Sequence, residues 1–395
     1  MIYKMIVLGD IHWDAFDIDK QRFEMQYPIE VIKNISDLSA VIIAGDYFDT
    51  KLNLNGKGAR AAVNWLSELV ALAKINNFKI RMIKGTNGHD YNQLEIFRGY
   101  EKDFDIDFKI ITETSKEELF PDFLCLYCPD ESMTSDDYNR IYSNLLYPAN
   151  PYDAVFFHGT FDIVAPNIAV QETESNEIRS VIFRYAEFEK ISRVMIGGHW
   201  HDAEDQNEEK DLSSPIHMYY TRSFSRWIHG EDRRKGCIFL AYNTDADSYL
   251  IHRIENPFAD QYETFTFDSS SMKSPEDFQD AMDYIRSVRE SHKNLFIRIK
   301  FLVMDDKGLN ETGLSIFRQK FINDKRIKFL VVDMLRKKKK RDDKKKIKEI
   351  SSRFSFVRDK GISCAEKIQK YISDTKSKDI PIDEIHSFID QYLNA

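Results

Sequence analysis

The chain has 395 residues, 42% of them hydrophobic, which is more than one core usually organises and therefore predicts more than one domain. No run approaches the ~18 apolar residues of a membrane helix, and the N-terminal residues lead into a strand without a signal-peptide pattern. We therefore expect a cytoplasmic protein with no membrane partner. The net charge is −9, but residues 1–335 carry −16, and so acidic a body does not attract polyanions by general electrostatics.

Apolar, strand-like runs alternate with helical patterns over residues 1–255, which is typical of a layered α/β domain. A helix is expected over Arg60–Lys74, where apolar residues recur at helical spacing. Five buried strands are expected, each followed at once by Gly, Asp or His: Ile6–Leu8, Val41–Ala44, Ile80–Ile83, Val155–Phe157 and Val194–Ile196. Three later strands are expected to complete a second sheet: Met218–Tyr220, Cys237–Ala241 and Tyr249–Ile251.

Cys125 and Cys128 form a lone CxxC pair within an apolar, strand-like stretch. No second CxxC and no neighbouring His completes a zinc site. We therefore predict buried, reduced thiols rather than a metal or redox role.

The pattern changes near Pro257, and residues 256–335 are predicted to form a small α/β domain of βαβ type. A helix begins at Ser274, with a capping Ser and Pro at the first helical position, and continues to about Arg289. The other expected elements are a strand over Leu295–Val303, a helix over about Glu311–Phe321 and a strand over Ile327–Val332.

The last part of the chain holds a basic run and a tail. Residues 336–348 contain ten Lys or Arg and two Asp, and residues 349–395 have helical patterning with one apolar face. The basic run is either a solvated linker or a contact for nucleic-acid phosphates. The residues assigned to that contact are Lys337, Lys338, Lys339, Lys340 and Arg341.

Five polar islands directly follow the five buried strands: Gly9–His12, Gly45–Asp49, Gly85–Asp90, His158-Gly159 and Gly198–His201. Carboxylate and imidazole ligands without a thiolate suit Mn²⁺, Fe²⁺ or Zn²⁺. Asp10 and His12 are two residues apart, so both can reach one ion, and Asp46 can bridge two ions. Two ions about 3.5–4 Å apart can place an attacking water oxygen opposite a phosphorus atom.

The order of these islands resembles the calcineurin-like metallophosphoesterase pattern: D-x-H, G-D-x-x-D, G-N-H-[D/E], H and G-H-x-H. The resemblance implies a layered β-sandwich core flanked by helices, and two divalent metal ions, with Mn²⁺ favoured. It implies that the metal ligands are Asp10, His12 and His201 for the first ion, Asp46 as a bridge, and His158 and His199 for the second. It also implies a catalytic His89 with Asp90 beside it, and an Asp49 that lies behind the ligands or caps a helix.

The third island departs from this pattern. The family usually has Asn, a ligand of the second ion, directly before the catalytic His, but here Gly88 takes that place and Asn87 comes one residue earlier. Either the turn is reshaped so that Asn87 still binds the ion, or the second ion loses a ligand. We favour Asn87 as the ligand.

The residues after His201 are similar to the SbcD-type nucleases of double-strand-break repair. Tyr220–Trp227, followed by Gly230-Glu231 and Lys235-Gly236, matches that family's Y-x-G-S-x-x-R, G-E and K-G segments, except that Arg222 replaces Gly. The small domain 256–335 would then be the DNA-capping domain, 336–348 a basic linker and 349–395 an ATPase-docking tail.

The resemblance implies an Mn²⁺-dependent DNA exonuclease and endonuclease that works with an SbcC-type coiled-coil ATPase, in the cytoplasm of a bacterium or a phage-infected host. It also implies a homodimer, for which the Arg60–Lys74 stripe is a candidate surface unless the domain's own core buries it. The alternatives are a small-molecule phosphodiesterase or phosphomonoesterase of the same superfamily, and a non-catalytic scaffold.

Overall fold

The structure is a computed structural model. It describes residues 1–53, 55–146, 151–164, 179–202, 217–226, 231, 233–268, 274–291, 295–303, 315, 319–321, 324 and 326–333. The chain divides into two compact units. One holds the described parts of 1–265, 283–299 and 322–328, and the other holds those of 266–282, 300–321 and 329–333.

The first sheet has six strands in the order β15-β14-β1-β2-β3-β4. Its parallel members are β1 (Ile2–Leu8), β2 (Leu38–Ala44), β3 (Lys79–Ile83) and β4 (Phe108–Ile111). The helices that join them are α1 (Ile18–Glu24), α2 (Gln26–Asn34), α3 (Lys57–Asn76), the 3-10 helix η1 (Gln93–Phe97) and α4 (Tyr100–Phe104). Alternate residues of β1 enter different cores, Ile6 on the helix side and Val7 on the other.

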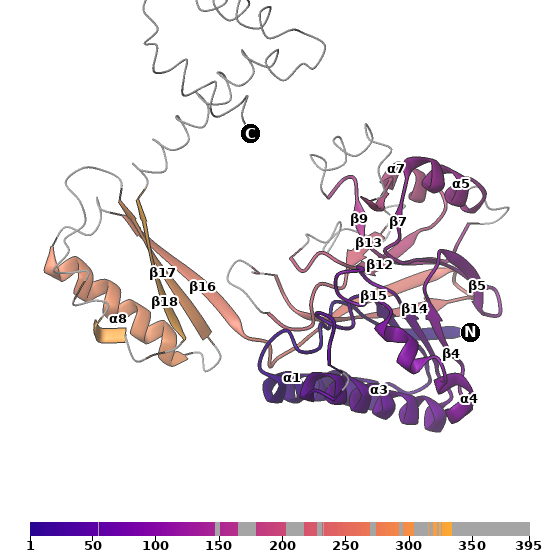
Figure 1. Ribbon diagram of the computed structural model, residues 1–395, viewed down its shortest axis with the longest axis horizontal. Helices are drawn as coiled ribbons and strands as arrows, with labels where there is room; N and C mark the ends of the chain where they lie inside the picture. The colour runs from indigo at the N-terminus through magenta and orange to yellow at the C-terminus, as the bar shows by residue number, and fades with distance from the viewer. Residues whose placement is uncertain are drawn as a thin grey trace, which may run out of the picture. The chain divides into compact units, whose positions relative to one another are not determined.

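The apolar stripe of α3 is buried in the core of its own domain. Trp65, Leu66 and Leu69 pack with Ile6 and Ile80 of the first sheet, and α1 and α3 lie along that face in Figure 1. The core therefore accounts for the stripe that was a candidate dimer surface.

The second sheet has five strands in the order β13-β12-β8-β6-β5. They are β5 (Ser115–Phe120), β6 (Phe123–Cys128), β8 (Ala154–His158), β12 (Val194–Gly198) and β13 (His217–Tyr220). One apolar cluster contains Val7 and Ile42 from the first sheet and Phe156 and Ile196 from the second, so the two sheets pack face to face. The unit is thus a mixed α/β arrangement with two sheets at its centre.

Shorter elements cover the outer face of the second sheet. They are the helices α5 (Ser135–Leu145) and α7 (Tyr185–Phe188) and the strand pairs β7 (Ser132–Met133) with β10 (Arg179–Ser180) and β9 (Thr160–Phe161) with β11 (Ile182–Phe183). Tyr142 and Phe188 of the two helices pack against Phe157 there. Figure 1 shows α5 and α7 close to β7 and β9.

All eight strands predicted in residues 1–255 are confirmed, but the sheet assigned to two of them is wrong. Strand β14 (Gly236–Asn243) pairs antiparallel with β1 from Ile2 opposite Asn243 to Val7 opposite Ile238, and β15 (Ser248–Glu255) pairs with β14. Both therefore extend the first sheet, and only β13 joins the second. The β1 edge would otherwise present unpaired backbone groups, and burial alternation within a strand does not specify which edge it joins.

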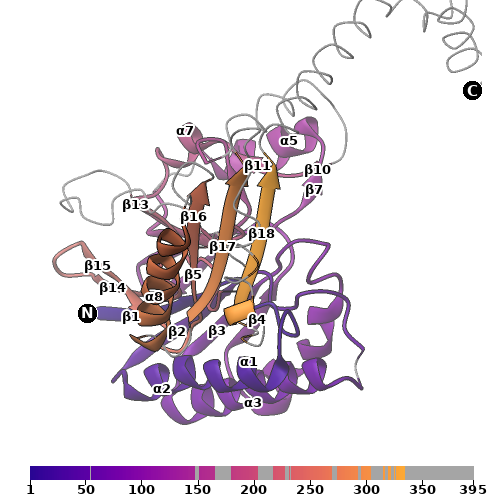
Figure 2. The same ribbon diagram turned by 90° about the vertical axis from the view of Figure 1, so that its left-hand side faces the viewer.

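The expected helix and strands after Pro257 are confirmed where the structure describes them. Helix α8 (Pro275–Ser291) begins with a capping box, since Asp277 N donates to Ser274 Oγ at 3.2 Å and Ser274 N to the Asp277 carboxylate at 2.7 Å. Strands β17 (Leu295–Val303) and β18 (Ile327–Asp333) form a three-stranded sheet with β16 (Gln261–Asp268), a strand the sequence analysis did not predict. Figure 2 shows α8 beside this sheet.

Several predictions fall on residues outside those described. Of the expected helix 311–321, only Ser315 and residues 319–321 are described, and these are helical. Two further segments lie outside the described residues: the basic run 336–348, with Lys337–Arg341, and the tail 349–395. The domain boundaries at 255, 335 and 348 stay predictions. Cys125 and Cys128 are free and buried, and burial raises the pKa of both thiols. Within the described part of the chain, no helix is long and apolar enough to cross a membrane.

Candidate metal centre

The islands meet because backbone hydrogen bonds tie the loops that follow β1 and β2. Asp10 N donates to Gly45 O at 3.1 Å, and His12 N to Asp46 O at 3.0 Å. Asp10, His12 and Asp46 all have positive φ, which turns each side chain out of the strand direction. A Cβ on Gly45 would lie 2.1 Å from His158 Nδ1, and its φ is +81°, so only glycine lets the second sheet approach here.

The structure brings together the side chains that the sequence analysis assigned to the first ion. Donor atoms of Asp10, His12 and His201 lie within 4.8 Å of one another. His201 Nε2 is 3.2 Å from His12 Nε2 and 3.7 Å from Asp10 Oδ1. Two nitrogen ligands about 2.1 Å from one ion are separated by about 3.2 Å at an angle near 100°, so this spacing fits a shared cation.

The side chains assigned to the second ion are also brought together. Donor atoms of Asp46, His158 and His199 lie within 4.8 Å of one another, and His158 Nε2 is 3.2 Å from Asp46 Oδ2. Asp46 Oδ2 is also 3.6 Å from His12 Nε2. Asp46 therefore lies between the two groups, where a bridging carboxylate would be required.

Three of these histidines, His158, His12 and His201, have a polar partner near Nδ1 and a carboxylate near Nε2. His158 Nδ1 donates to Ala44 O at 2.8 Å. His12 Nδ1 is 3.4 Å from Asp49 Oδ1, and His201 Nδ1 is 3.5 Å from Glu231 Oε1. Metal-binding histidines commonly have such partners, which fix the tautomer that leaves Nε2 as the ligand.

The electrostatics of the buried centre favour a cation. Burial would lower the pKa of His158, but Asp46 and Asp10 outweigh it and raise this pKa to about 10. Burial would likewise raise the pKa of Asp46, but His158 and His12 lower it instead. His199 differs, because burial and His158 lower its pKa to about 4. The carboxylates that stabilise a protonated His158 would also stabilise a divalent ion, which must displace that proton to bind Nε2.

The third island carries His89 and Asp90 in different environments. His89 Nδ1 contacts Asp49 O, and its ring meets the His12 ring edge-on at 4.4 Å between centroids. The buried Asp90 carboxylate accepts hydrogen bonds from Gly85 N at 2.7 Å and Phe48 N at 3.0 Å. Burial and then Asp46 raise the Asp90 pKa to about 7. Asp90 thus holds two loops in place, while its predicted part in catalysis stays a prediction.

Asn87 lies at the exposed edge of this island. Its Nδ2 donates to Ser132 Oγ at 3.2 Å, which leaves the amide oxygen as the atom that a metal could bind. A Cβ placed on Gly88 would meet no atom within 4 Å, so the turn has space for a side chain at this position. Thr86 instead contacts the bridging carboxylate, through its N at 2.7 Å and its Oγ1 at 2.9 Å from Asp46 Oδ1.

Glu231 and Lys235 contact His201, and neither was predicted as a site residue. Lys235 is buried and donates to His201 O at 2.7 Å and to Ser223 Oγ at 2.9 Å, and its Nζ lies 3.0 Å from Glu231 Oε2. The sequence feature that could have identified them is the pair of dipeptides Gly230-Glu231 and Lys235-Gly236. Arg222, the residue that departs from the resemblance described above, is buried with φ +62°, a conformation that glycine adopts without strain.

Comparison with known proteins does not assign a family. No protein-family model and no curated protein matches the chain. One crystal structure, whose title gives no function, aligns over 64% of this chain and 99% of its own, at 10% identity with a TM-score of 0.34. A likeness this low carries no argument.

Proposed function

We propose that this chain is a binuclear metal-dependent phosphodiesterase of the calcineurin-like metallophosphoesterase type and that its substrate is DNA. The observation that carries the proposal is the two neighbouring donor groups, Asp10/His12/His201 and Asp46/His158/His199. Asp46 Oδ2 lies 3.6 Å from His12 Nε2 of one group and 3.2 Å from His158 Nε2 of the other. The two packed sheets are the coarse arrangement that such a β-sandwich core requires.

In this proposal Asp10, His12 and His201 would hold one ion, His158 and His199 would hold the other, and Asp46 would be a ligand of both, with Asn87 as a further ligand of the second. Two such ions, for which we favour Mn²⁺, lower the pKa of water and neutralise charge that develops on a phosphoryl group. Asp49, Glu231 and Ala44 O orient the imidazoles.

His89 is the proposed proton donor or transition-state stabiliser. Its Nδ1 is occupied by Asp49 O, so its Nε2 is the atom that can hold a proton towards the substrate. Asp90 keeps the loop of His89 close to that of Asp46 by binding Gly85 N and Phe48 N. Donor atoms of His89, His12 and Asp46 lie within 4.8 Å of one another, which supports a role of this imidazole beside the ions.

DNA as the substrate rests on the residues after His201 and on the small α/β part of the chain. The proposed complex pairs this nuclease subunit with an SbcC-type coiled-coil ATPase, and two copies of the chain form its dimer. The net charge of −16 on residues 1–335 favours a second candidate, a phosphodiesterase or phosphomonoesterase of small molecules, because an acidic body repels polyanions.

The deciding experiment offers the purified full chain, with Mn²⁺, both linear duplex DNA and a small bis-ester of phosphate. We expect DNA degradation that a chelator abolishes and added Mn²⁺ restores. Robust turnover of the small ester with intact DNA would reverse the ranking of the two candidates. No turnover of either substrate would favour the non-catalytic scaffold.

A further inference from the structure

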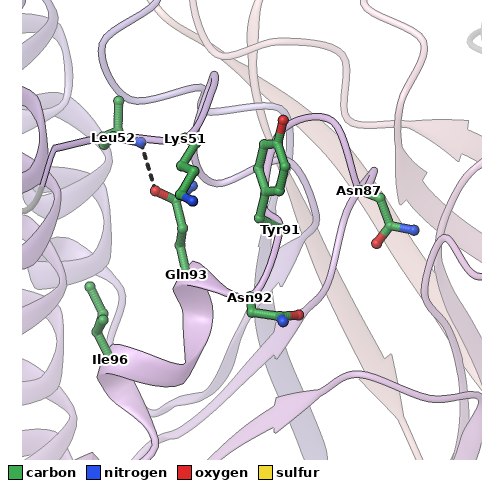
Figure 3. A pocket seen from close by; sticks show the side chains of 7 residues that line it. All are labelled: Lys51, Leu52, Asn87, Tyr91, Asn92, Gln93 and Ile96. Atoms are coloured by element: carbon green, nitrogen blue, oxygen red, sulfur yellow. Dashed lines mark hydrogen bonds between the residues drawn. The ribbon is translucent and has the colours of Figure 1, made fainter.

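A pocket opens beside the loop that carries His89. It encloses about 500 Å³, a volume suited to a small ligand, and Figure 3 shows its lining side chains. The residues that matter for its chemistry are Lys51, Asn87, Tyr91, Asn92, Gln93 and Ile96. Of these residues, Asn87 alone is among the proposed metal ligands.

Gln93 joins the pocket to the catalytic loops. Its Oε1 accepts from Leu52 N at 2.7 Å, and its Nε2 donates to Thr50 O at 3.1 Å and to His89 O at 3.2 Å. Thr50 follows Asp49, whose carbonyl oxygen contacts His89 Nδ1. The pocket therefore shares its wall with the loops that position the proposed catalytic imidazole.

Tyr91 supplies an exposed aromatic face in this wall. Its side chain is 45% exposed, and its backbone has φ +46°, a left-handed conformation that is unfavourable for a bulky residue. Ile96, also in the lining, is 38% exposed. A base presents a flat apolar face of this kind, and stacking on an aromatic ring is tolerant of base identity.

The polar part of the lining matches the rest of a nucleotide. Lys51 is exposed, and among the described residues no carboxylate pairs with it, so its ammonium is available to a phosphate within an otherwise acidic body. The exposed amide of Asn92 offers both donors and an acceptor, which is what the edge of a base requires.

We propose that this pocket binds one nucleobase of a single-stranded DNA end, stacked on Tyr91 with a neighbouring phosphate at Lys51, next to the phosphodiester at the metal centre. A single-stranded end fits because a base in duplex DNA is already stacked on its neighbours. This inference rests on the proposed function and specifies its substrate as an end with an unpaired base.

The test measures equilibrium binding to the full chain in chelator, where no cleavage occurs. The probes are a labelled single-stranded oligonucleotide and an abasic deoxyribose-phosphate oligomer of equal length, followed by fluorescence anisotropy. We expect the preference for the base-carrying probe to fall about tenfold in Tyr91→Ala and Tyr91→Asn and to persist in Tyr91→Phe. Asn tolerates the left-handed backbone, so it separates loss of the ring from loss of the loop.

Lys51→Ala should weaken the binding of both probes alike. It should also reduce, by about one, the slope of the logarithm of the binding constant against the logarithm of the salt concentration. The substitution Ile75→Ala, at a side chain 77% exposed on α3, is the control and should change neither probe. An unchanged preference in both ring-free variants would overturn the inference, as would an equal loss on the two probes.

The inference and the proposed function fail differently. The wild-type chain with Mn²⁺ could leave DNA intact while the Tyr91 variants still lose the binding preference for the base-carrying probe. That result would support the base-binding pocket and contradict the nuclease proposal. If the chain cleaves DNA and the ring-free variants bind both probes as the wild type does, the nuclease proposal stands and the pocket is not a base site.

Discussion

The islands after β1, β2, β8 and β12 differ from the island after β3 in how firmly the fold holds them. Asp10, Asp46 and His158 are almost completely buried, and the backbone around them is hydrogen-bonded between loops. Asn87 and Gly88 are exposed, although Thr86 and Asp90 on either side of them are hydrogen-bonded to the loop that follows β2. Packing leaves the buried residues after β1, β2 and β8 little freedom, whereas the exposed loop can change without disturbing the cores. In the proposed function the metal chemistry would therefore depend on the buried islands, and the third island would have room to affect the choice of substrate.

The largest effect on metal binding and cleavage is expected from removing the Asp46 carboxylate, which lies between the two donor groups. Asp46→Asn should lose both ions and lower cleavage on the order of 10³-fold or more, because in the proposal this carboxylate would be a ligand of both ions. Metal content after dialysis, measured by atomic emission, checks this. Asp245→Asn, an exposed carboxylate beside the N-terminus, is the matched control and should keep both ions. An Asp46 variant with two tightly bound ions would refute the bridge.

A smaller loss is expected when the catalytic imidazole alone is changed. His89→Asn should lower cleavage by about 10²–10⁴-fold while leaving metal content near the wild-type value, because His89 is assigned proton transfer and no ligand role. Single-turnover cleavage and atomic emission on the same preparation separate the two effects. Cleavage that survives the change would contradict the role of His89.

The next effect concerns Glu231, the buried carboxylate beside His201. Glu231→Gln removes the charge beside His201 Nδ1 and should weaken the first ion by about 10–100-fold. Calorimetric titration of Mn²⁺ into metal-free protein checks this. Glu255→Gln, whose exposed carboxylate pairs with Arg234, is the matched control. Equal affinities in all three proteins would mean that His201 needs no support from Glu231.

The irregular third island gives the smallest expected effect. If Asn87 is a ligand, Asn87→Ala should weaken the second ion by about tenfold and leave the first intact, and adding Gly88→Asn should restore it, since the space at position 88 is open. The Mn²⁺ stoichiometry of the two variants is the measurement. Ser132→Ala removes only the hydrogen-bond partner of Asn87 and serves as the control. Unchanged binding in Asn87→Ala would leave the second ion without this ligand.

The sequence by itself determined the strand-end positions of Asp10, Asp46, His158 and His199, because a buried strand followed by Gly and a polar residue is a local pattern. It also indicated the helix α3 and its apolar stripe, but not what that stripe packs against. Only the tertiary structure decided that β14 and β15 pair at the β1 edge, because partner choice depends on edges far apart in the chain.

The same holds within the site. Ala44 O and Glu231 contact imidazole rings from distant segments, and Lys235 donates to the backbone carbonyl of His201, so these residues gain a role only through the tertiary fold. The Tyr91 pocket likewise depends on the tertiary fold, because the Gln93 side chain bonds to the distant loop at Thr50 and Leu52. Local patterns thus determined which residues could bind metal, and long-range packing decided how they are held.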